Sequence, residues 1–164
     1  MGNVIDYLVQ YGDQAFAERA FCDVDILILA QLSYFDFGSA VPTIAQRKKS
    51  VTLEEIDRTA DLSAVFADKW YGENNRKLWN ALLAGRRFRT MRCNYYRERM
   101  EEEQEAQFGA VTFFPEGCEP VVAFRGTDDS VVGWKEDFNM AFLPVIPSQA
   151  DAADYVTKLG EGFP

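Results

Sequence analysis

The chain has 164 residues, of which 48% are apolar and 26% are charged, and its formal net charge is −9; this composition predicts one globular domain over residues 1–164. The acidic balance opposes a nucleic-acid partner, because nucleic-acid binding depends mainly on clustered Lys and Arg. The chain contains no histidine, which excludes a complete Ser-His-Asp or Cys-His site within these residues.

The first predicted elements are two helices. Asn3 is a good N-cap for a short amphipathic helix over residues 4–11, which Gly12 closes. Asp23 is placed to cap a second helix, whose apolar positions over residues 24–35 are too continuous for one stripe. We therefore expect this helix to be buried on most sides, with a strand over residues 26–30 as the alternative.

Two more helices are predicted before the midpoint of the chain. Thr52 has the pattern of an N-cap, with two glutamates in the first turn of a helix from Leu53 to about Trp70. The next helix starts at Asn74 or Asn75, and its apolar residues recur at steps of three and four until Gly85. The first half of the chain is therefore expected to be helical.

The second half is predicted to contain strands. From Thr90 to about Glu98 the side chains alternate in polarity, and the acidic run over residues 101–105 is expected to be a solvated loop or helix start. Residues 108–114 and 120–124 are two β-rich runs separated by a five-residue turn, which predicts an antiparallel hairpin.

The last predicted elements follow the hairpin. Trp134, Phe138 and Phe142 have four-residue spacing, typical of a helical turn or a packed loop. Ser148 is the expected cap of a final helix from Gln149 to about Leu159.

Cysteine usage and apolar run lengths exclude several sites. Cys22, Cys93 and Cys118 are widely spaced with no CxxC pair, so we expect reduced thiols in a cytoplasmic protein, with no metal and no cofactor. The amino end lacks the basic residues of a secretory signal. The longest apolar run, residues 26–30, is far shorter than the roughly 20 residues of a membrane span, so no stable membrane insertion is expected.

Two charged patterns are given structural interpretations. The six arginines between residues 86 and 99, interleaved with Tyr95 and Tyr96, favour a salt-bridged surface over an RNA or anionic-lipid site. The acidic pairs at residues 54–55 and 128–129 favour capping or solvent exposure over a glycosidase site, because adjacent carboxylates rarely flank one bond.

The most specific stretch of the sequence is Phe124-Arg125-Gly126-Thr127-Asp128-Asp129, followed by Trp134 and Asp137-Phe138. A strand that runs into Arg-Gly-Thr in this way resembles the amino-terminal part of lipase class 3-like α/β-hydrolases, and most closely an uncharacterised, Mbeg-like bacterial group. The resemblance implies an α/β class, as a partial α/β-hydrolase fold. Its order would be a helical N-terminal half, a strand, an antiparallel hairpin and a C-terminal helix.

The resemblance also assigns a site residue. It implies that Thr127 is an oxyanion-hole residue, which donates through its amide and its hydroxyl to the oxygen that becomes negative during acyl transfer. Arg125 and Asp137 are expected to brace this loop rather than to touch substrate. The local alternative is a strand-ending turn tied by Asp128 and Asp129.

The remaining parts of such a hydrolase are not in the sequence. No serine lies in a G-x-S-x-G elbow, and the base is missing because there is no histidine. We therefore expect the amino-terminal portion of a lipase- or esterase-like serine hydrolase, inactive alone, with an ester or lipid-like substrate only when the missing half is present. An incomplete sheet would favour self-association through its exposed edge. The alternative is a non-catalytic binding or interaction module derived from a hydrolase.

Overall fold

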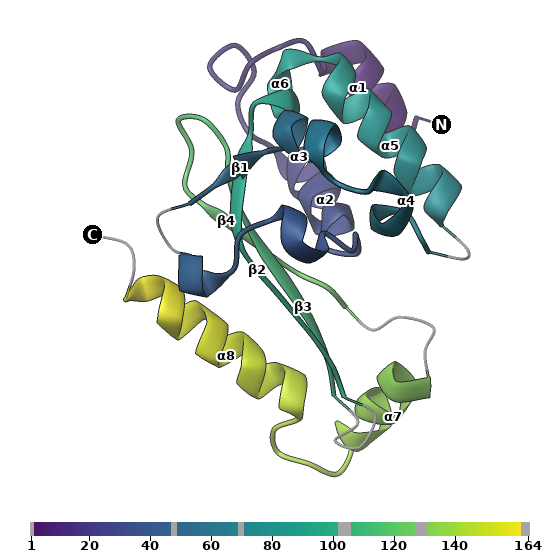
Figure 1. The fold of residues 1–164 in the computed structure, drawn as a ribbon, viewed down its shortest axis with the longest axis vertical. Coiled ribbons are helices and arrows are strands. Elements are labelled where there is room, and N and C mark those ends of the chain that lie inside the picture. The colour runs from purple at the N-terminus through teal and green to yellow at the C-terminus, as the bar shows by residue number, and fades with distance from the viewer. Residues whose placement is uncertain (1, 47–48, 69–70, 102–105, 127–130, 162–164) are drawn as a thin grey trace.

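In the computed structural model, residues 2–46, 49–68, 71–101, 106–126 and 131–161 are described. Helices dominate the first half, and a sheet followed by two helices makes up the second half, as predicted (Figure 1). Among these residues, no helix is both long enough and apolar enough to cross a membrane.

The helices and strands have the following bounds. The helices are α1 (Val4–Tyr11), α2 (Asp23–Leu32), α3 (Leu53–Thr59), α4 (Leu62–Val65), α5 (Gly72–Ala84), α6 (Arg86–Arg89), α7 (Val131–Asn139) and α8 (Pro147–Gly160), with 3₁₀ turns η1 (Gly38–Ala40) and η2 (Ile44–Gln46). The strands are β1 (Val51–Thr52), β2 (Arg92–Glu101), β3 (Ala106–Phe114) and β4 (Val121–Phe124).

Two of the predicted helix caps are confirmed. The Asn3 side chain accepts the backbone N–H of Asp6, and the Asp6 carboxylate accepts the N–H of Asn3. Thr52 and Glu55 form the same reciprocal pair at the start of α3. In both helices these bonds satisfy donors that the first helical turn leaves without an intrahelical partner.

Two other predicted caps are wrong. Helix α2 has Cys22 rather than Asp23 at its N-cap, because the Asp25 carboxylate reaches back to the Cys22 N–H at 2.9 Å. Helix α8 begins at Pro147 rather than after Ser148, because the fixed φ of proline suits the first helical position.

The predicted helix over residues 53–70 is also wrong in extent. It divides into α3 and α4, because the Asp61 side chain caps a new helix instead of continuing the old one. The expected end at Trp70 lies outside the described residues. Helix α5 begins at Gly72, ahead of the predicted start at Asn74 or Asn75.

The segment over residues 26–30 is helical, so the strand alternative is wrong. Its burial is one-sided rather than nearly complete. Ile28, Leu29 and Leu32 have no exposed surface, whereas Ile26 and Leu27 are 47% and 58% exposed. The continuous apolar run therefore supplies both a core face and an apolar outer face.

The described strands form one sheet in the order β1-β2-β3-β4, with every neighbouring pair antiparallel. The predicted hairpin is confirmed as β3 and β4, paired from Ala110↔Phe124 to Phe113↔Val121. The content is mixed helix and strand, as expected. Because the described sheet is antiparallel throughout, it does not by itself identify a partial α/β-hydrolase fold.

A bulge in β2 decides which side chains face which side of the sheet. Between the pairs Asn94↔Thr112 and Arg97↔Ala110, β2 has one residue more than β3. Tyr95 lies in this bulge with φ of 60°, a left-handed conformation that is strained for a residue other than glycine. The extra residue inverts the alternation, so Arg97 shares the face of Ala110.

The two faces of the sheet are covered by different helices (Figure 1). Helix α8 covers one face, where the Tyr155 and Thr112 hydroxyls are hydrogen-bonded at 2.8 Å. Arg97 and Arg99 of β2 both pair with Asp151 of α8, at 2.6 and 2.8 Å. The opposite face packs against the helices of the first half, which form the larger apolar core.

A buried ion pair ties the first half of the chain to the start of the sheet. Arg87 of α6 donates two hydrogen bonds to Asp25 of α2, at 2.9 and 2.6 Å, and neither side chain has exposed surface. The same guanidinium donates to the carbonyls of Gln14, Arg19 and Ala20 at 2.9–3.2 Å. All its donor nitrogens are thus used, as a buried arginine requires.

Asp25 is held in its charged form by its partners. Burial by itself would raise the pKa of Asp25, but hydrogen bonds from Arg87 and from the Cys22 amide outweigh burial and hold the pKa below its ordinary value. The Tyr7 hydroxyl also donates to Asp25 at 3.0 Å, and burial raises the pKa of Tyr7 to about 12. Tyr7 therefore remains a donor at neutral pH.

We predict that Arg87→Met lowers the free energy of unfolding by about 3–5 kcal/mol, because it leaves the Asp25 charge buried without its partner. Urea unfolding followed by circular dichroism measures this loss. The matched control is Arg86→Met, which removes a half-exposed pair with Glu18 and should cost much less. Equal losses in the two variants would contradict the role given to Arg87.

The low pKa of Asp25 predicts a specific pH dependence. A lowered folded-state pKa stabilises the protein above the unfolded pKa, and this contribution is lost as the pH falls through the folded value. The stability difference between the native chain and Asp25→Asn should therefore shrink as the pH falls below about 4. Asp23→Asn, an exposed change on the same helix, is the control and should show no comparable trend in urea titrations from pH 7 to pH 3.

Candidate functional site

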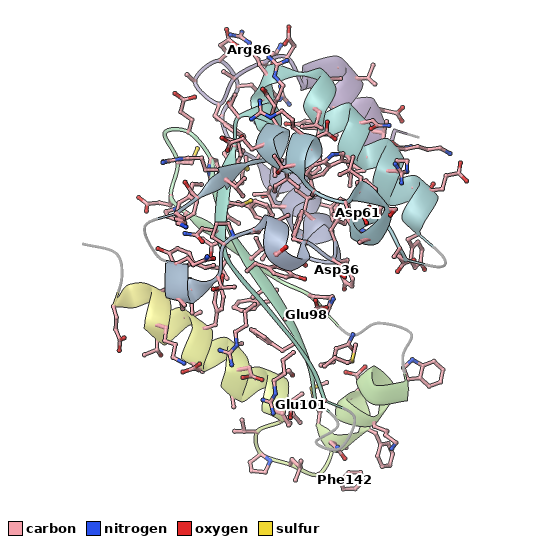
Figure 2. The ribbon with its side chains drawn as sticks, viewed as in Figure 1. Asp36, Asp61, Arg86, Glu98, Glu101 and Phe142 are labelled. Atoms are coloured by element: carbon pink, nitrogen blue, oxygen red, sulfur yellow. The ribbon has the colours of Figure 1, made fainter. Side chains whose placement is uncertain are left out.

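Arg125, the first residue of the Arg-Gly-Thr segment, lies in a row of three residues that crosses the sheet. Glu98 of β2 pairs directly with Gly109 of β3. Because Ala110 pairs with Phe124, the next position of β3, Gly109, lies opposite Arg125. Glu98, Gly109 and Arg125 therefore share the face of the sheet opposite α8, and Figure 2 shows Glu98 between the helical first half and α7.

An ion pair joins the two ends of this row. Arg125 Nη1 lies 2.7 Å from Glu98 Oε1, and the side chain of Arg125 is only 10% exposed. Neighbouring strands are about 4.8 Å apart, so the Arg125 and Glu98 side chains together span two strand spacings, and the guanidinium lies over Gly109 of β3. The pair is thus a cross-brace over three strands.

Gly109 makes this crossing sterically allowed. A Cβ atom at this position would lie 2.9 Å from Nε and 3.2 Å from Cζ of Arg125. A contact of 2.9 Å is essentially never seen for a real Cβ atom, so a side chain here would require the Arg125 side chain to shift. The backbone supports the same alignment, since the Arg125 N–H donates to the Gly109 carbonyl at 2.8 Å.

Tyr96 completes the polar cluster on this face. Its hydroxyl donates to Glu98 Oε2 at 2.8 Å. Burial, and then the nearby charge of Glu98, raise the pKa of Tyr96 far above its ordinary value. Tyr96 therefore stays protonated, and it fixes the Glu98 oxygen that Arg125 does not use.

Helix α2 contributes a second constraint on the strand end. A Cβ atom at Gly126 would lie 2.8 Å from the Tyr34 hydroxyl, just beyond the end of α2. Gly126 thus passes close to a side chain from the helical half.

One edge of the Arg125 guanidinium has no acceptor in the described part of the chain. Nε and Nη2 are buried and make no hydrogen bond there, while Nη1 carries the pair with Glu98. These two nitrogens lie on the side of a guanidinium that binds carboxylates with two parallel hydrogen bonds. The brace is therefore held by one ion pair and by contact with Gly109.

The other residues predicted for the site are described only in part. Thr127, Asp128 and Asp129 lie outside the described residues. Asp137 is exposed on α7. The expected bracing role of Arg125 agrees with its cross-strand pair. The sequence does not predict the roles of Glu98 and Gly109. The signal for Gly109 is a glycine inside the β-rich run over residues 108–114, which indicates a close approach of another group.

The predicted capping and salt-bridging of the other described charged groups is confirmed, except that the Arg87–Asp25 pair is buried and does not lie on the surface. Glu55 caps α3, and Glu54 lies 3.6 Å from Arg89. The arginine-rich stretch is largely salt-bridged, although most partners come from distant elements rather than from the glutamates that follow it. The pairs are Arg86–Glu18, Arg87–Asp25, Arg89–Glu54, Arg97–Asp151, Arg97–Asp154, Arg99–Asp151 and Arg99–Glu101.

Two hollows lie elsewhere on the molecule. One, of about 380 Å³, contains Asp36 and Asp61, whose carboxylates accept backbone N–H groups of Gly38 and Ser63 (Figure 2). The other, of about 460 Å³, lies beside α6 and the turn after β3. In the ranges that the structure describes, no three His, Cys, Asp or Glu side chains gather in a way that could hold a metal ion.

Comparison with known proteins gives a family. The Mbeg1-like family model matches residues 82–164, just over half of the chain. The chain belongs to the Mbeg1-like family. No curated protein and no solved structure matches it. The Mbeg1-like match begins near the end of α5 and includes β2, β3 and β4, so Glu98, Gly109 and Arg125 all lie within it.

We predict that Gly109→Ala lowers the free energy of unfolding by about 1–3 kcal/mol, because the added methyl group overpacks against Arg125. Gly160→Ala is the matched control, since a Cβ atom there meets nothing within 4 Å; its effect should stay within about 0.5 kcal/mol. Chemical denaturation measures both variants.

A double-mutant cycle tests the assigned cause. If the methyl group acts through the guanidinium, Gly109→Ala should cost less in an Arg125→Ala background than in the native chain. An unchanged cost would show that the clash lies elsewhere.

Proposed function

We propose that β4 and the Arg125-Gly126-Thr127 segment form the oxyanion-hole side of a lipase class 3-like serine hydrolase, which acts on an ester or lipid-like substrate. The observation that carries this proposal is the brace from Arg125 across Gly109 to Glu98. An oxyanion hole depends on donors that are already positioned before the charge develops. A rigid strand end immediately before Thr127 supports this requirement.

The chemistry assigns separate roles to the residues of this segment. In acyl transfer one donor is a backbone amide at the end of an early strand, and a second follows the nucleophile. Thr127 is proposed as the first donor, through its amide and its hydroxyl. Arg125 and Glu98 act as positioning residues, because they form an ion pair with each other across the sheet.

An antiparallel sheet is compatible with this proposal. Many largely parallel sheets carry antiparallel strands at one edge. Strand β4 is the last in the described order, and none of the described strands pairs with its outer side. That edge is where a further strand carrying the nucleophile would pair.

The catalytic serine and base must come from outside these 164 residues under this proposal. The chain has no histidine and no G-x-S-x-G motif. The chain alone is therefore proposed to lack turnover.

A second candidate is a non-catalytic binding or interaction module. It is favoured by one observation, the large apolar side chains that α7 and the turn after it expose. In this case the braced strand end would be a structural turn.

We predict that the 164-residue chain does not turn over short p-nitrophenyl esters, and that a longer chain continuing into a G-x-S-x-G elbow, an acidic residue and a histidine does. In the longer chain Thr127→Val should lower kcat more than it raises KM. The loss of a whole oxyanion donor corresponds to about 2.7–4 kcal/mol, and a retained amide gives a smaller loss.

The control for this experiment is Thr157→Val, an exposed threonine on α8, which should leave kcat unchanged. An inactive longer chain would favour the binding module. If the longer chain is active and Thr127→Val has no effect on kcat, Thr127 is instead part of a structural turn.

A further inference from the structure

Helix α7 and the turn that follows it expose an unusual set of large apolar side chains. Trp134, Phe138 and Phe142 are 68%, 69% and 70% exposed. Three aliphatic side chains from the same stretch are about half exposed; these are Met140 (49%), Leu143 (47%) and Val145 (57%). We call these six residues the α7 surface.

The aromatic part of the α7 surface is continuous rather than scattered. Trp134 and Phe138 are one helical turn apart, so they lie on the same side of α7. The rings of Phe138 and Phe142 are in contact, with centroids 5.1 Å apart. Helix α7 lies beside the far end of β2 and β3, and Phe142 lies at the outer limit of the molecule in Figure 2.

The exposed area is large for a single chain. An aromatic side chain has about 200 Å² of surface, so three rings at roughly 70% exposure leave about 400 Å² accessible. That value is already within the range of the largest apolar patch on a typical monomer, about 300–600 Å². A standard interface takes about 800 Å² from each partner, and the aliphatic side chains and turn backbone extend the surface toward that size.

Charge restricts what can cover this surface. Residues 138–150, which include five of the six residues of the α7 surface, contain no ionisable side chain, although Lys135, Glu136 and Asp137 lie between Trp134 and Phe138; the whole chain has a net charge of −9. A phospholipid surface with anionic headgroups would repel such a chain. A strongly basic partner would have no acidic side chain to pair with in residues 138–150. The surface therefore fits a partner that is itself apolar and uncharged at the contact.

We propose that a second copy of this chain covers the α7 surface, in an isologous dimer in which the same six residues meet on both sides. A second copy carries the required uncharged, aromatic surface, and a two-fold contact needs only a patch that is complementary to itself. The exposed Trp134 and the paired rings are the side-chain types that dominate binding energy at interfaces. This assignment does not depend on the proposed hydrolase function.

Sedimentation velocity of the full 164-residue chain over a range of concentrations tests the proposal. We expect a reversible monomer–dimer equilibrium. The double change Phe138→Ser with Phe142→Ser should raise the dimer dissociation constant by at least about tenfold. The matched control is Val9→Ser with Val156→Ser, two exposed valines on α1 and α8, which should leave the dissociation constant unchanged.

Several outcomes would overturn the proposal. A native chain that stays monomeric at every concentration would do so, as would an equal effect of the control pair. A dimer that survives the double change would indicate another contact, such as the outer edge of β4. Binding of the monomeric chain to neutral phosphatidylcholine vesicles, lost on the double change, would assign the surface to lipid instead. Circular dichroism checks folding, and the single change Phe142→Ser replaces the double change if the latter unfolds.

Discussion

The interaction on which the rest of the structure depends is the ion pair between Arg87 and Asp25, from which water is excluded. A buried pair of charges is stabilising only when its remaining donors and acceptors are satisfied. Here the loop between α1 and α2 wraps around the guanidinium and offers it three carbonyls. The pair thus fixes that loop and the relative positions of α2 and α6. Because β2 starts only three residues after Arg89, the first strand of the long hairpin is aligned from the same anchor.

Two backbone features then determine the position of the end of β4. The bulge at Tyr95 inverts the side-chain alternation of β2, so Arg97 and Arg99 face α8 while Glu98 faces the helical half. Gly109 leaves β3 without a side chain at the one position that Arg125 must cross. Without the bulge Glu98 would lie on the wrong face, and without the glycine Arg125 would not reach it. The position of the strand end is therefore set by residues far away in the sequence.

Local signals were sufficient to predict much of the fold, because capping and turn chemistry act within a few residues. The Asn3 and Thr52 caps and the hairpin over residues 108–124 are examples. The break between α3 and α4 is harder to predict, because Asp61 can either continue a helix or cap a new one, and here it caps α4. The bulge could not be predicted, since a positive φ is rare at a tyrosine and the local sequence carries no signal for it.

The candidate site was predictable only at its most specific motif. The sequence around Arg125 indicated a braced strand end, but not the partner of the brace, because Glu98 is an ordinary exposed-looking residue in a strand of mixed polarity. Its role follows from the register of three strands, which requires knowledge of the pairing. A lone glycine in a strand signals a close approach, yet it does not tell which side chain approaches.

The net charge of the chain also affects how an exposed apolar surface can associate. A charge of −9 makes copies repel one another over distances of about one Debye length, roughly 8 Å at physiological ionic strength. Apolar attraction acts only at contact, and the part of the α7 surface from Phe138 to Val145 contains no ionisable side chain. The long-range repulsion and the short-range attraction therefore act on different parts of the surface. Added salt weakens only the repulsion, so an association through α7 would strengthen with salt, whereas one built on opposite charges would weaken.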